Sequence, residues 1–440
     1  MERAEAGGTS TIFTVRAFFV ALGLMEPKTI LWIVISIATA GYILDQVLDW
    51  LNLRAMRRDV PDEVAEFYDR DRYLKSLDYH GVRTRFSFLS SAFSFAVTML
   101  MLLAGGFGWL DTVLRTFVDS EILLSLAFFG VLALASDVLS VPFQVYATFV
   151  IEERYGFNRT TPRTFILDKL KGYLLGAVIG APLLGLLIWL VMQIGPGFWL
   201  WFGVTAALFV LFVNVFYTTL ILPLFNKLTP LPDGELKSAI EAFAAKVNFP
   251  LDNIFVIDGS RRSSKANAFF SGMGRRKKIV LYDTLIDKHA TDELVAILAH
   301  EVGHFKKKHI VQGFALSVVQ IFFTLFVLSL MVYNESLSFA LGGNQHSIHL
   351  NLIVFSILFA PISGVIGILM QMLSRKNEFE ADAYAREHYD GPALAAALKK
   401  LSVDSLSNLF PHPLYVFFHY SHPPLLARLR AIERQEEVYG

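Results

Sequence analysis

The stretch VAILAHEVGHFKKKHI, residues 295–310, places two histidines and a glutamate at the edge of an apolar segment. On a helix, His300 and His304 differ by about 40° of rotation and one turn of rise, so both imidazoles can reach one metal ion. Glu301 lies about 100° from His300, close enough to take a proton from an attacking water without being a ligand. The spacing therefore predicts a hydrolytic metal centre.

A catalytic zinc site usually has three protein ligands and one open position, so a third ligand is needed. The chain has no cysteine, which leaves nitrogen and carboxylate ligands. The segment SRKNEFEADAYAREH (374–388) supplies Glu378 as the predicted third ligand. One helical turn later, Asp382 could hydrogen-bond to a histidine and fix its orientation, whereas Glu380 should point away from both. Two membrane spans between the motifs would return the chain to the same side.

The composition indicates a protein that lies in a lipid bilayer. The elements that position these residues should therefore be membrane spans. The chain is 54% hydrophobic and only 18% charged; soluble proteins have about 25% charged residues. Lysines plus arginines and aspartates plus glutamates are equal, at 39 each. We therefore expect the lipid bilayer, and no nucleic acid, as a partner.

Seven transmembrane helices are predicted, since one span needs about 20 mostly apolar residues. Two of them share the uncharged run from Gly172 to Asn226, which the sequence GPG at 195–197 divides. The other five are expected near 28–51, 86–110, 121–150, 310–334 and 348–373.

Arginine and lysine accumulate in the segments 52–85 and 152–171, which lie on one side of this topology. The positive-inside rule places that side in the cytoplasm. The same side receives the two polar parts of the chain, 227–309 and 374–440. The predicted fold is therefore predominantly α, a polytopic membrane protein with a small α+β zincin-like domain on the cytoplasmic side.

The chain divides into four predicted parts. Short β-like runs, NIFVID (253–258) and KKIVLYD (277–283), precede a helix over 291–309 with Thr291 as its N-cap. The parts are an N-terminal membrane domain with five spans (1–226), a catalytic segment with the HExxH helix and, between the two β-like runs, a strand or loop (227–309), a transmembrane hairpin (310–373) and a C-terminal catalytic segment with the predicted third ligand (374–440).

Three aspartates, Asp45, Asp49 and Asp137, lie in predicted spans or at their ends. Charge is costly there unless it faces water or a partner. A water-filled interior explains them, and so does a buried pair or a position at the membrane interface; the sequence leaves the choice open.

The remaining histidines have simpler interpretations. His289 and His309 are expected at the surface or the membrane interface, although either could support a metal ligand. His346 and His349 are expected in a loop on the far side. Lysines 306–308 are interpreted as a headgroup anchor at a helix end.

These motifs resemble those of the integral-membrane CaaX prenyl endopeptidases, the type I family of zinc proteases that process prenylated C-termini. The similarity lies in AHEVGHFKKKH, SRKNEFEADAYA, SSKANAFFSG, KKIVLYDTLI and HYSHPPLLARLRAI. It also includes EERYGFNRTTPRTF (152–165), which is similar to a segment of this family that its smaller relatives do not have. The resemblance runs from about the third span to the C-terminus.

For the metal centre, the resemblance implies one Zn²⁺ ion held by His300, His304 and Glu378. Glu301 matches the general base of the family. The resemblance also implies a membrane architecture of helices that encloses a large chamber.

For the substrate, the resemblance implies that Asn267 and Ala268 lie on an edge strand that pairs with the peptide backbone, which is β-augmentation. His422 and Arg428 match a histidine and an arginine that stabilise the oxyanion of the reaction. From the residues alone, HYSHPPLLARL is a proline-initiated amphipathic helix, and the two interpretations are compatible.

The predicted function is a zinc-dependent membrane endopeptidase that removes the C-terminal aaX tripeptide after a prenylated cysteine. One alternative is a membrane quality-control metalloprotease that acts on misfolded or non-prenylated proteins. The other is a membrane channel or transport protein with a vestigial metal site. The sequence is compatible with a monomer and leaves the oligomeric state open. The C-terminal RQEEVYG has no lysine-based retrieval signal, which favours a prokaryotic inner membrane over the endoplasmic reticulum.

Overall fold

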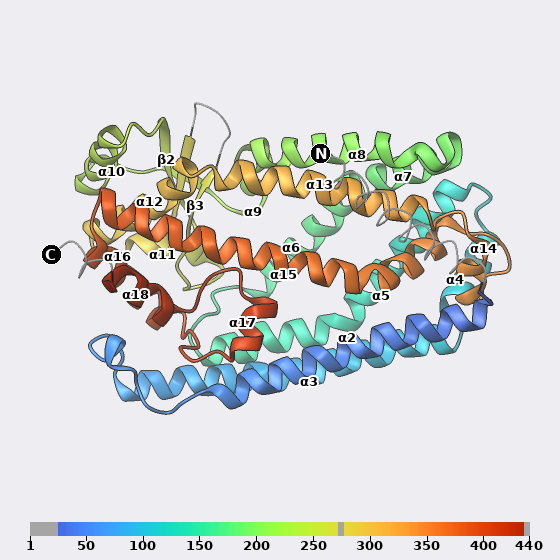
Figure 1. Cartoon of the computed structure of the whole chain (residues 1–440), viewed down its shortest axis with the longest axis horizontal. Coiled ribbons are helices and arrows are strands. Elements are labelled where there is room, and N and C mark those ends of the chain that lie inside the picture. The colour runs from blue at the N-terminus through green and yellow to red at the C-terminus, as the bar shows by residue number, and fades with distance from the viewer. Residues whose placement is uncertain (1–24, 272–276, 435–440) are drawn as a thin grey trace, which may run out of the picture.

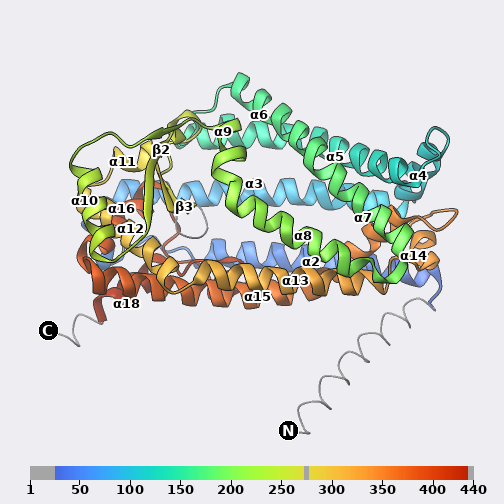
Figure 2. The same ribbon diagram turned by 90° about the horizontal axis from the view of Figure 1, so that it is seen from above.

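The computed structural model describes residues 25–271 and 277–434. Long helices run along the longest axis of the molecule, and a small sheet lies at one end (Figures 1 and 2). We call the end with the sheet the sheet end; it also holds α10 (Glu235–Lys246), α12 (Thr291–Lys306), α16 (Gly391–Asp404) and α18 (Leu425–Arg434). The opposite end, with α4 (Gly106–Arg115) and α14 (Glu335–Ala340), is the far end. The C-terminal segment used for the membrane assignment lies almost wholly outside the described residues.

By length and composition, six of the described helices could cross a membrane. One of them, Pro162–Phe225, is 64 residues long and reverses at the turn Gly195–Gly197, so it can cross twice. Gly195 has a φ of 70°, which favours glycine, and the helices before and after it, α7 (Ala181–Ile194) and α8 (Phe198–Phe216), lie side by side (Figure 2). The helices thus agree with the predicted seven crossings.

The bounds of the long helices differ somewhat from the predicted spans. They are α2 (Pro27–Ala55), α3 (Arg70–Leu103), α5 (Glu121–Tyr146), α6 (Pro162–Leu175), α7 (Ala181–Ile194), α8 (Phe198–Phe216), α13 (His309–Ser329) and α15 (Ile348–His388). Wider π-helical turns extend three of them, at Ala147–Glu152, Gly176–Gly180 and Tyr217–Ile221, and the last turn leads into α9 (Leu222–Phe225).

The second predicted span ends earlier than expected. The uncharged run 86–110 was expected to form one span, but α3 ends at Leu103 and α4 occupies Gly106–Arg115. Gly105 separates them with a φ of 65°, a left-handed conformation that stops a helix. Hydropathy does not detect this break because α4 is itself apolar.

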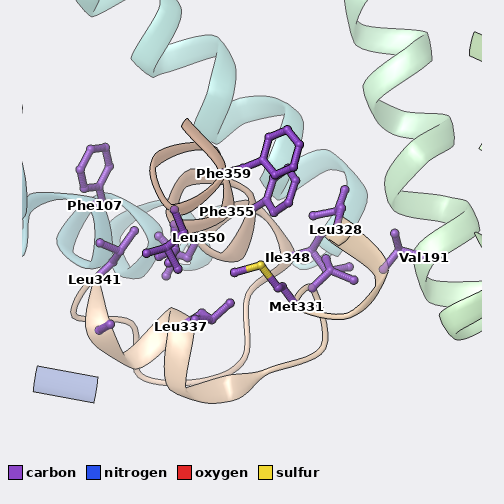
Figure 3. Packing of buried hydrophobic residues seen from close by; sticks show 14 of the residues in the cluster. Phe107, Val191, Leu328, Met331, Leu337, Leu341, Ile348, Leu350, Phe355 and Phe359 are labelled. Carbon is purple, nitrogen blue, oxygen red and sulfur yellow. The ribbon is translucent and has the colours of Figure 1, made fainter. Parts of the chain in front are cut away.

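An apolar core holds the far end together (Figure 3). It joins Phe107 of α4, Leu337 of α14 (Glu335–Ala340), and Leu350 and Phe355 of α15. Gly108 is required here, because a Cβ at that position would lie 2.1 Å from the carbonyl oxygen of Gly342.

A buried polar network lies beside this core. His349 is fully buried in the first turn of α15, so its prediction as a loop residue is wrong, whereas His346 does lie in the loop before that helix. His349 Nε2 lies 2.7 Å from Asp111 Oδ1, and His349 Nδ1 lies 3.0 Å from the Ser125 hydroxyl. Arg115 donates to both oxygens of Asp111. Hydrogen bonds of this kind let polar groups remain inside a membrane protein.

The sheet has the strand order β1-β2-β4-β3, with β2 and β4 parallel and the outer pairs antiparallel. β3 therefore forms an edge. The two predicted strands are present as β2 and β4. The bounds are β1 (Leu228–Pro230), β2 (Leu251–Ile257), β3 (Ala268–Ser271) and β4 (Lys277–Tyr282).

Six helices surround the sheet end: α10 (Glu235–Lys246), α11 (Asp283–Ile286), α12 (Thr291–Lys306), α16 (Gly391–Asp404), α17 (Pro413–His419) and α18 (Leu425–Arg434). Helix α12 begins at Thr291 with Ala290 at the cap position, so the prediction of Thr291 as N-cap is wrong. The Glu293 carboxylate accepts a hydrogen bond from the Ala290 amide instead.

Candidate functional site

The close contact of α12 with α15 creates the site. A Cβ on Gly303 would lie 3.0 Å from both the Ala381 Cα and the Tyr384 Cβ, so only glycine lets the two helices approach this far. The glycine of HEVGH therefore has a packing role. It brings the motif of α12 against the second motif, which lies on the last turns of α15.

His300, His304 and Glu378 meet at this contact. The Nε2 atoms of the two histidines are 3.2 Å apart. Glu378 Oε1 lies 3.3 Å from His304 Nε2, and Glu378 Oε2 lies 3.5 Å from His300 Nε2. Ligands about 2.1 Å from a tetrahedral zinc ion are about 3.4 Å from one another, which matches these spacings.

The donor atoms also have the character that a metal site requires. Glu378 is 5% exposed, and its Oε2 accepts no hydrogen bond from any described residue. A buried carboxylate oxygen without a hydrogen bond is costly. Arg428 Nη1 lies 3.4 Å from this oxygen without forming a hydrogen bond to it, so the oxygen can still take a metal ion as a closer partner. Nitrogen and carboxylate ligands suit zinc, so these three residues fit a bound zinc ion.

Behind His300 lies an ion pair. His300 Nδ1 is 2.8 Å from Asp382 Oδ1, which leaves Nε2 to face Glu378. Burial would raise the pKa of Asp382, but the Arg428 guanidinium donates to both carboxylate oxygens and lowers the pKa to about 2. Asp382 therefore stays ionised and can hold His300 in one tautomer.

Behind His304 lies a longer relay. His304 Nδ1 is 3.0 Å from His309 Nδ1, and His309 Nε2 is 3.2 Å from Glu380 Oε2. If His309 donates to the Glu380 carboxylate, its Nδ1 accepts from His304, and His304 Nε2 keeps its lone pair for a metal. His309 is buried, so the surface prediction for it is wrong, and it contacts His304 as the alternative interpretation expected.

Sequence reasoning missed the role of Glu380 in this relay. Lys308 has a φ of 62° and ends the continuity between α12 and α13, which turns His309 back toward His304. No helical spacing rule spans such a turn. The only signal was a third histidine five residues after His304.

Glu301 lies on α12 next to His300. Burial raises the pKa of this carboxylate, and the neighbouring His300 and His304 oppose the rise. A raised pKa moves a carboxylate toward the range in which a general base works near neutral pH.

His422 and Arg428 approach the same carboxylate from the C-terminal segment. His422 Nε2 lies 3.3 Å from Glu378 Oε1, and its side chain is 64% exposed. Arg428 Nη1 lies 3.4 Å from Glu378 Oε2, while its other donors bind Asp382. Both side chains border the candidate metal centre.

The edge strand lies beside α12, as the contacts between β3 and that helix show. Ala268 is the first residue of β3, and Asn267 precedes it. The Asn267 carbonyl accepts from the Tyr282 amide of β4, and its side chain accepts from the Ala268 amide. The opposite edge of β3 has no neighbouring strand in the described sheet.

Other polar residues lie away from the centre. His289 is buried against Glu293, so its surface prediction is wrong. Asp137 forms an ion pair with Lys169, at 2.7 Å, which favours the paired interpretation of this aspartate. Asp45 is exposed and Asp49 is partly buried on α2.

Family models match both halves of the chain. The model described as CAAX prenyl protease N-terminal, five membrane helices, matches residues 49–227. The model of peptidase family M48 matches residues 230–436. The second match contains every residue of the candidate metal centre.

Whole proteins are similar over nearly the full chain. CAAX prenyl protease 1 homolog from Oryza sativa subsp. japonica is 36% identical, over 89% of this chain and 94% of that protein. The protein of the same name from Homo sapiens is 32% identical, over 86% and 89%. The crystal structure of S. mikatae Ste24p has a TM-score of 0.88 and 32% identity, and the match covers 93% of this chain and 99% of that one.

Proposed function

We propose a reaction for this chain from the premise that the chain belongs to peptidase family M48, within its CAAX prenyl protease branch. It is an integral membrane metalloendopeptidase whose substrate is a peptide or protein. Neither alternative, a quality-control protease or a channel, is favoured, because the relatives that carry the prenyl protease name match nearly the whole chain.

One zinc ion is the metal that we propose, with His300, His304 and Glu378 as its ligands. The three ligand atoms within 4.8 Å of one another carry this proposal. When bound, zinc supplies Lewis-acid polarisation to the peptide carbonyl and the attacking water.

The side chains around the metal then have distinct roles. Glu301 accepts the proton of the attacking water and returns it to the leaving amine. His422 and Arg428 donate hydrogen bonds to the oxyanion that develops at the scissile carbonyl. Asp382 holds His300 and Arg428 in place.

The substrate, in our proposal, is a chain that ends in a prenylated cysteine followed by the tripeptide aaX, and the cut releases that tripeptide. Asn267 and Ala268 bind the peptide backbone in an extended conformation along the edge of β3. The names of the relatives support the prenylated substrate, and the long apolar helices next to the site suit a lipid-modified peptide.

We propose that the sheet end faces the cytoplasm, because the arginines and lysines of 52–85 and 152–171 lie in the segments that join the membrane helices there. The relatives compared come from eukaryotes, which favours the endoplasmic reticulum over the prokaryotic inner membrane expected from the C-terminus. The four-part division at 226, 309 and 373 and the enclosed chamber remain predictions.

The test is cleavage of a farnesylated CaaX peptide by the purified protein, with and without a chelator. We expect cleavage to stop with chelator and to return with zinc. Glu301→Ala should retain stoichiometric zinc and lose cleavage, whereas Asp292→Asn, an exposed carboxylate on the same helix, should behave as wild type. Retained cleavage in Glu301→Ala would contradict the assigned base, and equal cleavage of an unmodified peptide would contradict the prenylated substrate.

A further inference from the structure

A cavity of about 540 Å³ opens directly beside the candidate metal centre. His422 and Arg428 line it at one end, and Tyr79, Arg83 and Lys265 line another part of its wall. His422 and Arg428, which border the candidate metal centre, therefore share one cavity with this group of cations. The proposed catalytic roles involve only the first of these two regions, that of His422 and Arg428.

The second region is built around Tyr79. Lys265 Nζ donates to the Tyr79 hydroxyl at 2.9 Å and lies 3.1 Å from Glu152 Oε2. Arg83 Nη1 donates to the same hydroxyl at 3.2 Å. Glu152 is the one carboxylate within ion-pair distance of either cation among the described residues. Two cations therefore share one anion, and the group has a net positive charge.

The EERYGFN segment, residues 152–158, holds this group in place. The Phe157 carbonyl accepts from the Ser264 amide at 3.1 Å, immediately before Lys265 in the chain. Lys265 Nζ lies 4.3 Å from the centre of the Phe157 ring. The first residue of the segment, Glu152, is the shared anion. A segment of the membrane domain thus sets the position of a lysine of the catalytic segment.

We propose that Arg83 and Lys265 bind the free α-carboxylate of the substrate and so place the cut three residues from its C-terminus. This inference rests on the proposed function, because it assumes a substrate whose C-terminal tripeptide is released. Arg83 and Lys265 share Glu152 as their one carboxylate partner among the described residues, so the α-carboxylate of the substrate would supply the second negative charge. The α-carboxylate is thus the ligand of a subsite, and this subsite lies on the side of the metal centre that receives the leaving tripeptide.

The spacing along the chain agrees with a three-residue measure. Lys265 lies three residues before Ala268, in the irregular segment that leads into β3, and three residues of an extended peptide cover about 10 Å. A peptide that pairs antiparallel with β3 runs toward the N-terminal end of that strand. Its C-terminal carboxylate would then arrive at Lys265 when the scissile bond lies near Ala268. A longer chain end would have to pass through the cationic group.

The experiment compares two farnesylated peptides that differ only at the C-terminus, one with a free acid and one with a carboxamide. For the wild-type protein we expect kcat/KM to be about 10- to 100-fold higher for the acid, the range expected when one charge-assisted hydrogen bond is lost. In Lys265→Gln and in Arg83→Gln this ratio should fall toward one, and Lys265→Arg should restore much of it. The ratio reports recognition of the carboxylate, which a general loss of folding would not change.

Two matched cations serve as controls. Arg72→Gln removes an arginine from the same helix as Arg83, and Lys237→Gln removes a lysine from α10; each forms its own ion pair elsewhere. Both variants should retain the wild-type ratio. Equal cleavage of acid and amide by the wild type, or an unchanged ratio in both Lys265→Gln and Arg83→Gln, would overturn the inference while leaving the protease intact. No cleavage of either peptide by the zinc-loaded protein would overturn the proposed function itself, and this inference with it.

Discussion

At the scale of single residues, the two histidines of the centre are supported unequally. His300 is held directly by Asp382, whose charge is balanced by a buried arginine. His304 is held through His309, and the relay ends on Glu380, whose side chain is 39% exposed. Solvent and salt therefore weaken the support of His304 more than that of His300.

Glu378 is the residue whose loss should remove the metal. Glu378→Gln keeps the shape of the side chain but removes the anionic ligand, so we expect zinc affinity to fall by at least about 100-fold, beyond the loss typical of an outer partner. Zinc content after dialysis measures this. Glu387→Gln, an exposed carboxylate on the same helix, is the matched control and should bind zinc as wild type does. Full zinc in Glu378→Gln would rule out this ligand.

Most residues of the candidate metal centre could be predicted from the sequence, because helical spacing relates them to one another. The four-residue interval of His300 and His304 and the one-turn offset of Glu378 and Asp382 follow from the geometry of one helix. Arg428 came only from the family resemblance, and its bonds to Asp382 could not be foreseen, since 46 residues separate the two. Contacts of this length depend on tertiary packing, for which a single sequence has no periodic signal.

At the scale of elements, the site depends on how closely α12 and α15 pack. Each helix carries part of the proposed ligand set, so the distance between their axes fixes the distance between His304 and Glu378. Gly303 permits that distance, because a Cβ at this position would lie 3.0 Å from atoms of α15, which would have to shift to accommodate it. Small residues at helix contacts generally permit such an approach.

Gly303→Ala tests this packing. The added Cβ must displace the backbone of α15, and such overpacking costs about 1–3 kcal/mol. We expect a lower unfolding temperature in detergent together with reduced zinc content, because the helices must move apart. Gly313→Ala on α13 is the control, since a Cβ there meets nothing within 4 Å. Equal zinc content and stability in the two variants would show that α12 and α15 tolerate the added methyl group.

The spans were predictable from composition because the bilayer requires long apolar helices. Two features of the elements were not. Gly105 divides an uncharged run into α3 and α4, and α15 continues without a break from a span into the second motif. Both depend on local conformation, to which hydropathy is insensitive.

At the scale of the whole molecule, polar and apolar contacts fasten the far end. Arg115 joins Asp111, Glu121 and the Ser347 hydroxyl, so one side chain links α4 to α5 and to the loop before α15. The surrounding apolar core belongs to the same elements (Figure 3). The start of α15 is therefore fixed at the end opposite the metal centre.

Asp111→Ala tests this anchor. The change leaves the buried His349 Nε2 without its acceptor and removes one of the two carboxylates that pair with Arg115, and breaking one partner of a buried charged pair costs about 3–5 kcal/mol. We expect a clear drop in the unfolding temperature in detergent, while zinc content per folded protein is retained. Asn344→Ala, which removes an exposed amide hydrogen-bonded to Thr112 at the same end, should have little effect. Similar unfolding temperatures for the two variants would contradict the anchor.

Because α15 is continuous, a movement of the helix at the far end is transmitted to Glu378 at the candidate metal centre. From His349 to Glu378 the helix rises about 44 Å, and Pro361, which cannot donate a backbone hydrogen bond, lies between them. A bend of ~5° at Pro361 would move Glu378 by ~2 Å, a large fraction of a metal–ligand distance. A bend of this helix would therefore change the distance between Glu378 and the two histidines of α12, so the far end of α15 and the geometry of the candidate centre belong to one lever.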